Sequence, residues 1–209
     1  MNYSGVCLEG YGYVLPEKVI TSEQIEEGLS SLYKKFGVSP GLLQGLTGVK
    51  ERRVWDMGTL PSTIATEAAH KALLMADIPP RSIDAVVHTG VCRDSLEPAT
   101  AIRVHNNLGL SSKCLAFDVS NACLGFLNGM FTVANMIELG QINSALVVTG
   151  ENAAPLYKKT SELLQKELDE KSFRDSFASL TLGSAGVAFV LTKKNLSRKM
   201  HQFLGGVVK

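Results

Sequence analysis

The chain has 209 residues, of which 45% are hydrophobic, 20% charged and 7% aromatic. This composition is typical of folded globular proteins and excludes intrinsic disorder for the chain as a whole. The formal net charge is +1, so no global field attracts nucleic acid or an anionic membrane surface, and we expect neither as a partner. No apolar run approaches the roughly 18 residues that a membrane helix needs, so we expect a cytoplasmic chain without a transmembrane segment.

The four cysteines are Cys7, Cys92, Cys114 and Cys123. They form no C-x-x-C pair and are too few for a disulfide scaffold of this length, which favours reduced thiols and argues against structural zinc. We therefore expect no metal, and because neither a Walker loop nor a G-x-G-x-x-G motif is present we expect no resident cofactor.

Short β-rich bursts alternate with helical stretches, which is the pattern of an α/β fold with parallel strands. A first strand or hairpin is expected at 5–14, a helix with a Thr cap at 21–35, and a short irregular strand at 48–55. An Ala-rich helix is expected from residue 62 to residue 76, and it stops before a Pro-Pro pair.

The alternation continues through the second half of the chain. The pattern predicts strands at 83–88, 114–119, 144–149 and 185–191, and helices at 99–107 and 122–139, the last one closed by Gly140. Residues 155–180 carry dense mixed charge on a helical frame, which is typical of a solvated helix face. In the tail we expect a strand at 203–208 that begins a further unit, so we expect the chain to stop before that unit is complete.

The most informative stretch is 117–130, where a strand turns through a few small residues into an apolar helix. The turn predicts that Cys123 lies near the N-terminus of that helix. There the helix dipole favours the thiolate that attacks acyl groups, and backbone N–H groups can hold an oxyanion. The alternative is that Cys123 is a small buried hydrophobe, which is our interpretation of the other three cysteines.

Three segments in one order resemble the thiolase superfamily and, within it, the ketoacyl-ACP synthase III group. They are LTGVKERRV at 46–54, DVSNACLGF at 118–126 and TLGSAGVAF at 181–189. The resemblance covers nearly the whole chain and implies an α/β thiolase-like fold, here its N-terminal half, with a five-stranded mixed sheet and helices on both faces. It also implies that Cys123 is the acyl-accepting nucleophile.

Residues 93–100, 121–130 and 135–142 look like the bacterial olefin-biosynthesis branch of this group. Its enzymes join two long-chain acyl-CoA molecules by a non-decarboxylative Claisen condensation. The likeness implies a homodimer in which Glu97 reaches into the partner's active site and removes the α-proton of an acyl thioester. A carboxylate whose pKa is raised in an apolar channel suits that task, whereas the alternative for Glu97 is a solvated loop carboxylate.

The same likeness implies four substrate-binding residues. Arg52 and Arg53 would meet the phosphates of CoA, and Gly183 and Gly186 would allow close backbone approach beside the nucleophile. The alternatives are a solvated pair of surface arginines and glycines that serve packing alone.

Family members also use a His and an Asn to polarise the second acyl group, and both lie in a C-terminal half beyond the end of this chain. None of His70, His88, His105 and His201 replaces that His, and we expect all four to be core or surface residues without a catalytic role. We therefore expect residues 1–194 to form the N-terminal half that carries the nucleophile and 195–209 to begin a truncated C-terminal half.

The leading hypothesis is an acyltransferase that loads a fatty acyl group from acyl-CoA onto Cys123 for condensation to a 2-alkyl-3-ketoacyl product. One alternative is a decarboxylative ketoacyl-ACP synthase III that uses an acyl carrier protein, with Glu97 incidental. Another is an inactive half that acts as a dimerisation partner. A truncated half leaves an apolar face open, so we also expect poor solubility of the isolated chain.

Overall fold

The computed structural model describes residues 1–167 and 169–207. Residue 168 of the charged segment and residues 208 and 209 of the tail lie outside the described residues. The chain divides into two compact units. Unit 1 comprises Met1–Val14, Leu60–Glu151 and Ala185–Lys209, and unit 2 comprises Leu15–Thr59 and Asn152–Ser184.

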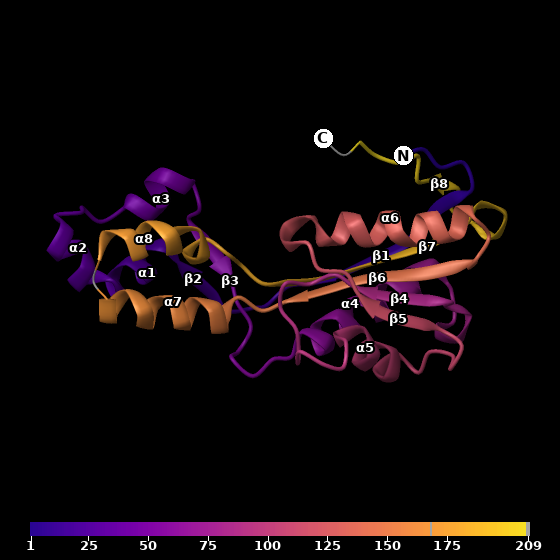
Figure 1. Ribbon diagram of the computed structural model, residues 1–209, viewed down its shortest axis with the longest axis horizontal. Helices are drawn as coiled ribbons and strands as arrows, with labels where there is room; N and C mark the ends of the chain where they lie inside the picture. Colours follow the sequence, from indigo (N-terminus) through magenta and orange to yellow (C-terminus); the bar gives the residue numbers. More distant parts are fainter. Residues whose placement is uncertain (168, 208–209) are drawn as a thin grey trace. The chain divides into compact units, whose positions relative to one another are not determined.

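Unit 1 is built on a six-stranded mixed sheet with the order β5-β4-β6-β7-β1-β8 (Figure 1). Strands β5, β4 and β6 run parallel, and β7 lies antiparallel between β6 and β1. The strands are β1 (Val6–Val14), β4 (Ala85–His88), β5 (Leu115–Asp118), β6 (Ser144–Glu151), β7 (Ala185–Lys193) and β8 (His201–Gln202). The helices are α4 (Pro61–Ala76), α5 (Thr100–Leu108) and α6 (Gly125–Glu138), with 3-10 turns η1 (Pro80–Ser82), η2 (Ala122–Leu124) and η4 (Lys194–Leu196).

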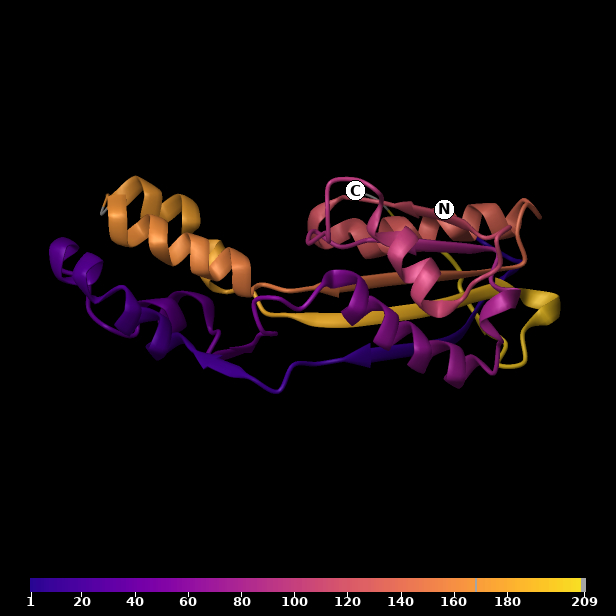
Figure 2. The ribbon, with the colours of Figure 1, turned by 90° about the horizontal axis from the view of Figure 1, so that it is seen from below.

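Helices cover both faces of this sheet, as the resemblance implied. α6 lies on one face, and its residues Val133 and Ile137 share a core cluster with Val87 and Val147 of the sheet. α4 and α5 lie on the other face, which Figure 2 shows from the side of these two helices. There α4 runs against β1, β7 and β6.

Glycines in the strands let the Ala-rich helix α4 lie close to the sheet. A Cβ atom at Gly12 would come 2.3 Å from the carbonyl oxygen of Ala68, and one at Gly150 would come 2.1 Å from that of Pro61. Ala68 and the other alanines on this side of α4 are fully buried. Small residues on both sides of the contact therefore bring the two backbones together without a void.

All five strands expected for this sheet are present, but the sheet has a sixth strand, so the predicted number of five is wrong. The sixth strand, β8, comes from the tail and pairs antiparallel with β1, where Cys7 faces Gln202. The tail strand therefore lies at 201–202 and not at 203–208; of the described residues beyond it, Gly205 forms a single bridge with Asn2. The division into halves at residue 194 stays a prediction.

Unit 2 contains a two-stranded antiparallel sheet of β2 (Val19–Thr21) and β3 (Glu51–Arg53), so the short strand expected at 48–55 is present. Its helices are α1 (Ser22–Gly28), α2 (Ser30–Phe36), α3 (Leu42–Thr47), α7 (Ala154–Glu167) and α8 (Glu170–Ser176), with the 3-10 turn η3 (Phe177–Leu180). α7 and α8 bury Leu164 and Phe173 and carry exposed i,i+4 ion pairs outside, which confirms the solvated face.

The single helix predicted at 21–35 is wrong, because the chain breaks at Leu29 between α1 and α2. Thr21 does cap α1, and the Gln24 side chain completes a capping box with it. The break follows from Gly28 and Ser30, which favour helix ends, while Leu29 is buried and anchors the corner.

A buried carboxylate organises the helices after this corner. Glu26 accepts the Tyr33 hydroxyl at 3.0 Å and the N–H groups of Gly41 and Leu43 at 2.6 Å each. Burial and this hydrogen bond raise the pKa of Tyr33. Glu26 therefore ties α1 to α2 and to the start of α3.

Candidate functional site

Cys123 lies in a sharp turn between β5 and α6. After β5 ends at Asp118, the chain reverses through Ala122, which has a φ of +43°, a left-handed value rare for a residue other than glycine. Cys123 follows in the 3-10 turn η2, and α6 begins at Gly125. The strand, turn and helix expected around Cys123 are therefore present, with the thiol one 3-10 turn ahead of the α-helix.

The start of α6 is held firmly against the end of β4. A Cβ atom at Gly125 would come 2.6 Å from the carbonyl oxygen of Thr89, and one at Gly129 would come 2.5 Å from the Thr89 methyl group. In the turn itself, Asn121 Nδ2 donates to Asn128 Oδ1 at 2.6 Å. Cys123 is an exposed residue of the described chain, on a turn that its neighbours fix.

Glu97 lies in the loop of residues 90–99 between β4 and α5, and its side chain is exposed. Among the described residues no hydrogen bond or ion pair joins Glu97 to Cys123. The described part of the chain thus shows no direct polar contact between the two predicted catalytic residues.

Three other carboxylates fix the loop that carries Glu97. Glu151, at the end of β6, accepts the N–H groups of residues 91 and 92 at 2.6 and 3.1 Å. Asp94 accepts the N–H of the second residue of α4 at 2.9 Å. Asp118 accepts the N–H groups of the first two residues of α5 at 2.9 Å each. The loop is thus anchored at its start, middle and end.

Among these carboxylates lies His88, which is 1% exposed. Its Nδ1 atom is 3.9 Å from Oδ1 of Asp118, and among the residues that the structure describes neither ring nitrogen has a hydrogen-bond partner. Burial lowers the pKa of His88, and the field of Asp118 opposes this shift. The expectation that His88 is a core residue agrees with its burial, but the surrounding carboxylates were missed. The signal was that Asp118 and Glu151 end parallel strands, where ligand sites of α/β sheets form.

Arg52, Arg53 and Gly183 lie together in unit 2. The Arg52 guanidinium is buried and donates to Ser22 Oγ at 3.1 Å, whereas Arg53 is exposed and donates to the carbonyl oxygen of Pro16 at 2.9 Å. A Cβ atom at Gly183 would lie 3.5 Å from Cβ of Arg52. Burial gives Arg52 a role inside unit 2, and contact of either arginine with CoA phosphates stays a prediction.

Gly186 lies in unit 1, in β7. A Cβ atom there would come 2.6 Å from Cγ2 and 2.9 Å from the carbonyl oxygen of Ile64 in α4. The close backbone approach expected at Gly186 is therefore present, but its partner is α4. A role of Gly186 in substrate binding stays a prediction.

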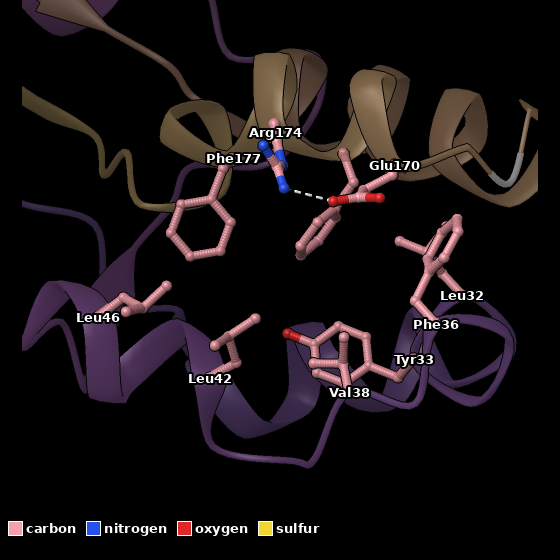
Figure 3. A pocket seen from close by; sticks show the side chains of 10 residues that line it. Leu32, Tyr33, Phe36, Val38, Leu42, Leu46, Glu170, Arg174 and Phe177 are labelled. Carbon is pink, nitrogen blue, oxygen red and sulfur yellow. Dashed lines mark hydrogen bonds and ion pairs between the residues drawn. The ribbon is translucent and has the colours of Figure 1, made fainter.

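Unit 2 also contains an apolar pocket of about 470 Å³ between α2, α3 and α8 (Figure 3). It is lined by Leu32, Tyr33, Phe36, Val38, Leu42, Leu46, Glu170, Phe173, Arg174 and Phe177. The polar groups of this lining are largely paired: Arg174 bonds to Glu170 at 2.5 Å, and the Tyr33 hydroxyl donates to Glu26. Such a lining favours a hydrocarbon ligand. None of the residues predicted as site residues lines this pocket.

Two further features bear on the type of site. Within residues 1–167 and 169–207, no group of three or more His, Cys, Asp or Glu side chains is placed to hold a metal ion. In the same part of the chain, no helix has the length and apolar character that crossing a bilayer requires.

The sequence matches known proteins along its whole length. The family described as 3-oxoacyl-[acyl-carrier-protein (ACP)] synthase III matches residues 117–206. An acyl-CoA:acyl-CoA alkyltransferase of Xanthomonas campestris is 40% identical over 100% of this chain and 62% of its own length. A protein of the same name from Shewanella oneidensis is 42% identical over 98% of this chain and 60% of its own. The chain thus spans about three fifths of these relatives.

Solved structures agree with this result. Cerulenin-bound OleA of Xanthomonas campestris superposes with a TM-score of 0.95 at 40% sequence identity, covering 99% of this chain and 64% of that one. The acetamide-bound form gives the same values. The fold is therefore thiolase-like, and the chain is similar to ketoacyl-ACP synthase III-like enzymes of the thiolase superfamily and, along its own length, to the OleA alkyltransferases.

Proposed function

We propose that the whole protein is a condensing enzyme in which Cys123 accepts a fatty acyl group from acyl-CoA. The observation that carries this proposal is the exposed thiol on the fixed turn between β5 and α6, with Ala122 in the left-handed region. The thiolate attacks the acyl carbonyl carbon, the bond from that carbon to the CoA sulfur breaks, and the CoA thiolate takes a proton from solvent.

In the second step the condensation is non-decarboxylative. The Glu97 carboxylate removes an α-proton from a second acyl-CoA, and the resulting carbanion attacks the thioester on Cys123. A carbon–carbon bond forms, the bond from the acyl carbon to Cys123 breaks, and a 2-alkyl-3-ketoacyl-CoA leaves. The similarity to acyl-CoA:acyl-CoA alkyltransferases supports this reaction, and so does a Glu97 that is exposed on an anchored loop.

The assembly that fits this reaction is a homodimer in which Glu97 serves the Cys123 site of the partner. Strand β5 supports this proposal because it forms one edge of the sheet, and Leu115 in it is 49% exposed. Edge strands present free N–H and C=O groups to which a second copy can pair.

The test is intact mass spectrometry of the chain after incubation with a fourteen-carbon acyl-CoA. The wild type is expected to gain one acyl group and release one free CoA. Cys123→Ser should gain none, while Cys92→Ser, the matched control, should behave as the wild type. Glu97→Gln should also form the adduct, because Glu97 acts only after acylation.

Other outcomes select the alternatives. No adduct on folded wild-type protein contradicts a working nucleophile in this chain and favours an inactive dimerisation partner. Product formation that requires malonyl-ACP and releases carbon dioxide favours a decarboxylative synthase, a class whose member from Erythrobacter litoralis is 35% identical over 69% of this chain.

A further inference from the structure

His88 contacts both loops that carry the predicted catalytic residues. Its backbone carbonyl accepts the N–H of Val119 at 2.9 Å, at the point where the Cys123 turn begins. Its ring lies below Gly90, the first residue of the loop that carries Glu97: a Cβ atom at Gly90 would come 2.7 Å from Cε1 and 3.0 Å from Nε2 of His88. One residue thus touches the Cys123 turn through its backbone and the Glu97 loop through its side chain.

The surroundings of the ring are unusual for a core histidine. It is 1% exposed, both nitrogens lack a hydrogen-bond partner within the described part of the chain, and Asp118 lies 3.9 Å from Nδ1. Buried polar groups without partners are rare because desolvation destabilises them. An apolar side chain would fill this space without that cost, so the imidazole meets a requirement beyond filling space. Asp118 lies beside the ring, the charges of Asp94 and Glu151 also act on it, and all three carboxylates anchor the loop, so we look for that requirement in the loop.

We propose that His88 is a positioning residue for Glu97: its ring, packed against Gly90 and beside Asp118, keeps the loop of residues 90–99 in the arrangement that presents Glu97. The catalytic consequence rests on the function proposed above for Glu97. The ordering of the loop by His88 does not depend on it.

The charges around the ring give this role a pH dependence. Burial lowers the pKa of His88 and outweighs Asp118, Glu151 and Asp94, which raise it; Arg93 lowers it further. The pKa of a histidine in an unfolded chain is about 6.5, and the pKa of His88 in the folded protein is lower. Between these two pKa values the folded state binds fewer protons than the unfolded state. Stability from the neutral ring is therefore complete above pH ~6.5 and is lost as the pH falls through the folded-state pKa. A protonated ring also competes for Asp118, which holds two N–H groups of α5.

Hydrogen–deuterium exchange of the 209-residue chain, at pH 7.5 and 5.5 and corrected for the intrinsic rates, tests this proposal. His88→Asn should speed exchange of residues 90–101 at pH 7.5 by about tenfold and leave residues 119–139 within about twofold. Lowering the pH further, until the His88 ring protonates, should speed loop exchange in the wild type and have no such effect in His88→Asn. His70→Asn, at an exposed position of α4, is the matched control and should follow the wild type.

The proposal is overturned if His88→Asn leaves loop exchange unchanged. It is also overturned if exchange rises equally in the loop and the strands, which would make His88 a space-filling core residue. If the Asn variant does not fold, His88→Gln and the acid response of the wild type provide the same test. Acyl adduct formation is measured in parallel, so failure of Cys123 to acylate contradicts the proposed function while the exchange result still decides the role of His88.

Discussion

At the scale of single residues, the backbone at Ala122 is the distinctive feature of the candidate site. Its φ of +43° lies in the region that a Cβ atom disfavours by roughly 1–2 kcal/mol. The contact of α6 with Thr89 and the hydrogen bond between Asn121 and Asn128 hold the turn in this conformation. Local strain of this kind is common where a side chain must be presented to a substrate.

Ala122→Gly should therefore change the free energy of unfolding by less than about 1 kcal/mol, because relief of the Cβ strain offsets the greater entropy of the unfolded chain. The acylation rate of Cys123 should fall, because the turn gains freedom. Urea unfolding and the time course of the acyl adduct measure the two effects.

The matched control is Ala134→Gly, in the buried face of α6. It should lower the free energy of unfolding by about 1–2 kcal/mol, through helix propensity and lost burial of a methyl group. Equal losses for Ala122→Gly and Ala134→Gly would contradict the assignment of strain to Ala122.

At the scale of elements, the packing of α4 on the sheet gives different surroundings to Gly183 and Gly186, which the resemblance had assigned the same role. Gly186 faces α4, where a Cβ atom would come within 2.6 Å of Ile64. A Cβ atom at Gly183, in unit 2, would lie 3.5 Å from its nearest neighbour, Cβ of Arg52, which is an ordinary contact distance. The helix position therefore requires glycine at 186 and not at 183.

Gly186→Ala should lower the free energy of unfolding by about 1–3 kcal/mol, because α4 must move away from β7. Gly183→Ala should change it by less than about 0.5 kcal/mol, the range of substitutions away from tight contacts. Urea unfolding of both variants measures the difference. Similar values for the two would show that α4 adjusts freely to a larger residue.

At the scale of the whole molecule, the edge strand β5 and the exposed apolar residues at the ends of α6 are candidate surfaces for association with another chain. Leu124 and Leu139, at the two ends of α6, are 58% and 74% exposed. Exposed apolar residues of this kind promote association, so poor solubility of the isolated chain stays a prediction. The edge of β5 allows a sharper test of the proposed homodimer.

In β5 the N–H groups alternate between β4 and the free edge. Those of Leu115 and Val119 donate to carbonyl oxygens of Asp84 and His88, so the N–H of Ala116 points to the edge. Ala116→Pro removes that donor and spares the ladder with β4. Light scattering should show that the wild type and the control Ala116→Ser are dimers and that Ala116→Pro is a monomer. The circular dichroism spectrum of Ala116→Pro should match that of the wild type. A monomeric wild type or a dimeric proline variant would contradict pairing through β5.

Local patterns made much of the fold predictable. The strands and the helix around Cys123 follow from the hydrophobic runs and small residues of 114–139, and the helix α4 follows from its alanines and the proline pair after it. Each of these signals lies within about 25 residues of the element that it predicts, a range over which periodicity and turn chemistry act. The break at Leu29 had weaker local signals, because a helical pattern spans it.

By itself the sequence determined the α/β class, the strand–turn–helix around Cys123 and the resemblance to ketoacyl-ACP synthase III, because these depend on the order of residues along one segment. Tertiary structure alone decided the pairing of β8 with β1 from opposite ends of the chain, the burial of Arg52, and the contact of Gly186 with α4. It also placed His88 among carboxylates from β5, β6 and the loop of residues 90–99. These features depend on distances between segments remote in sequence, and such distances are set only when the sheet and its helices pack.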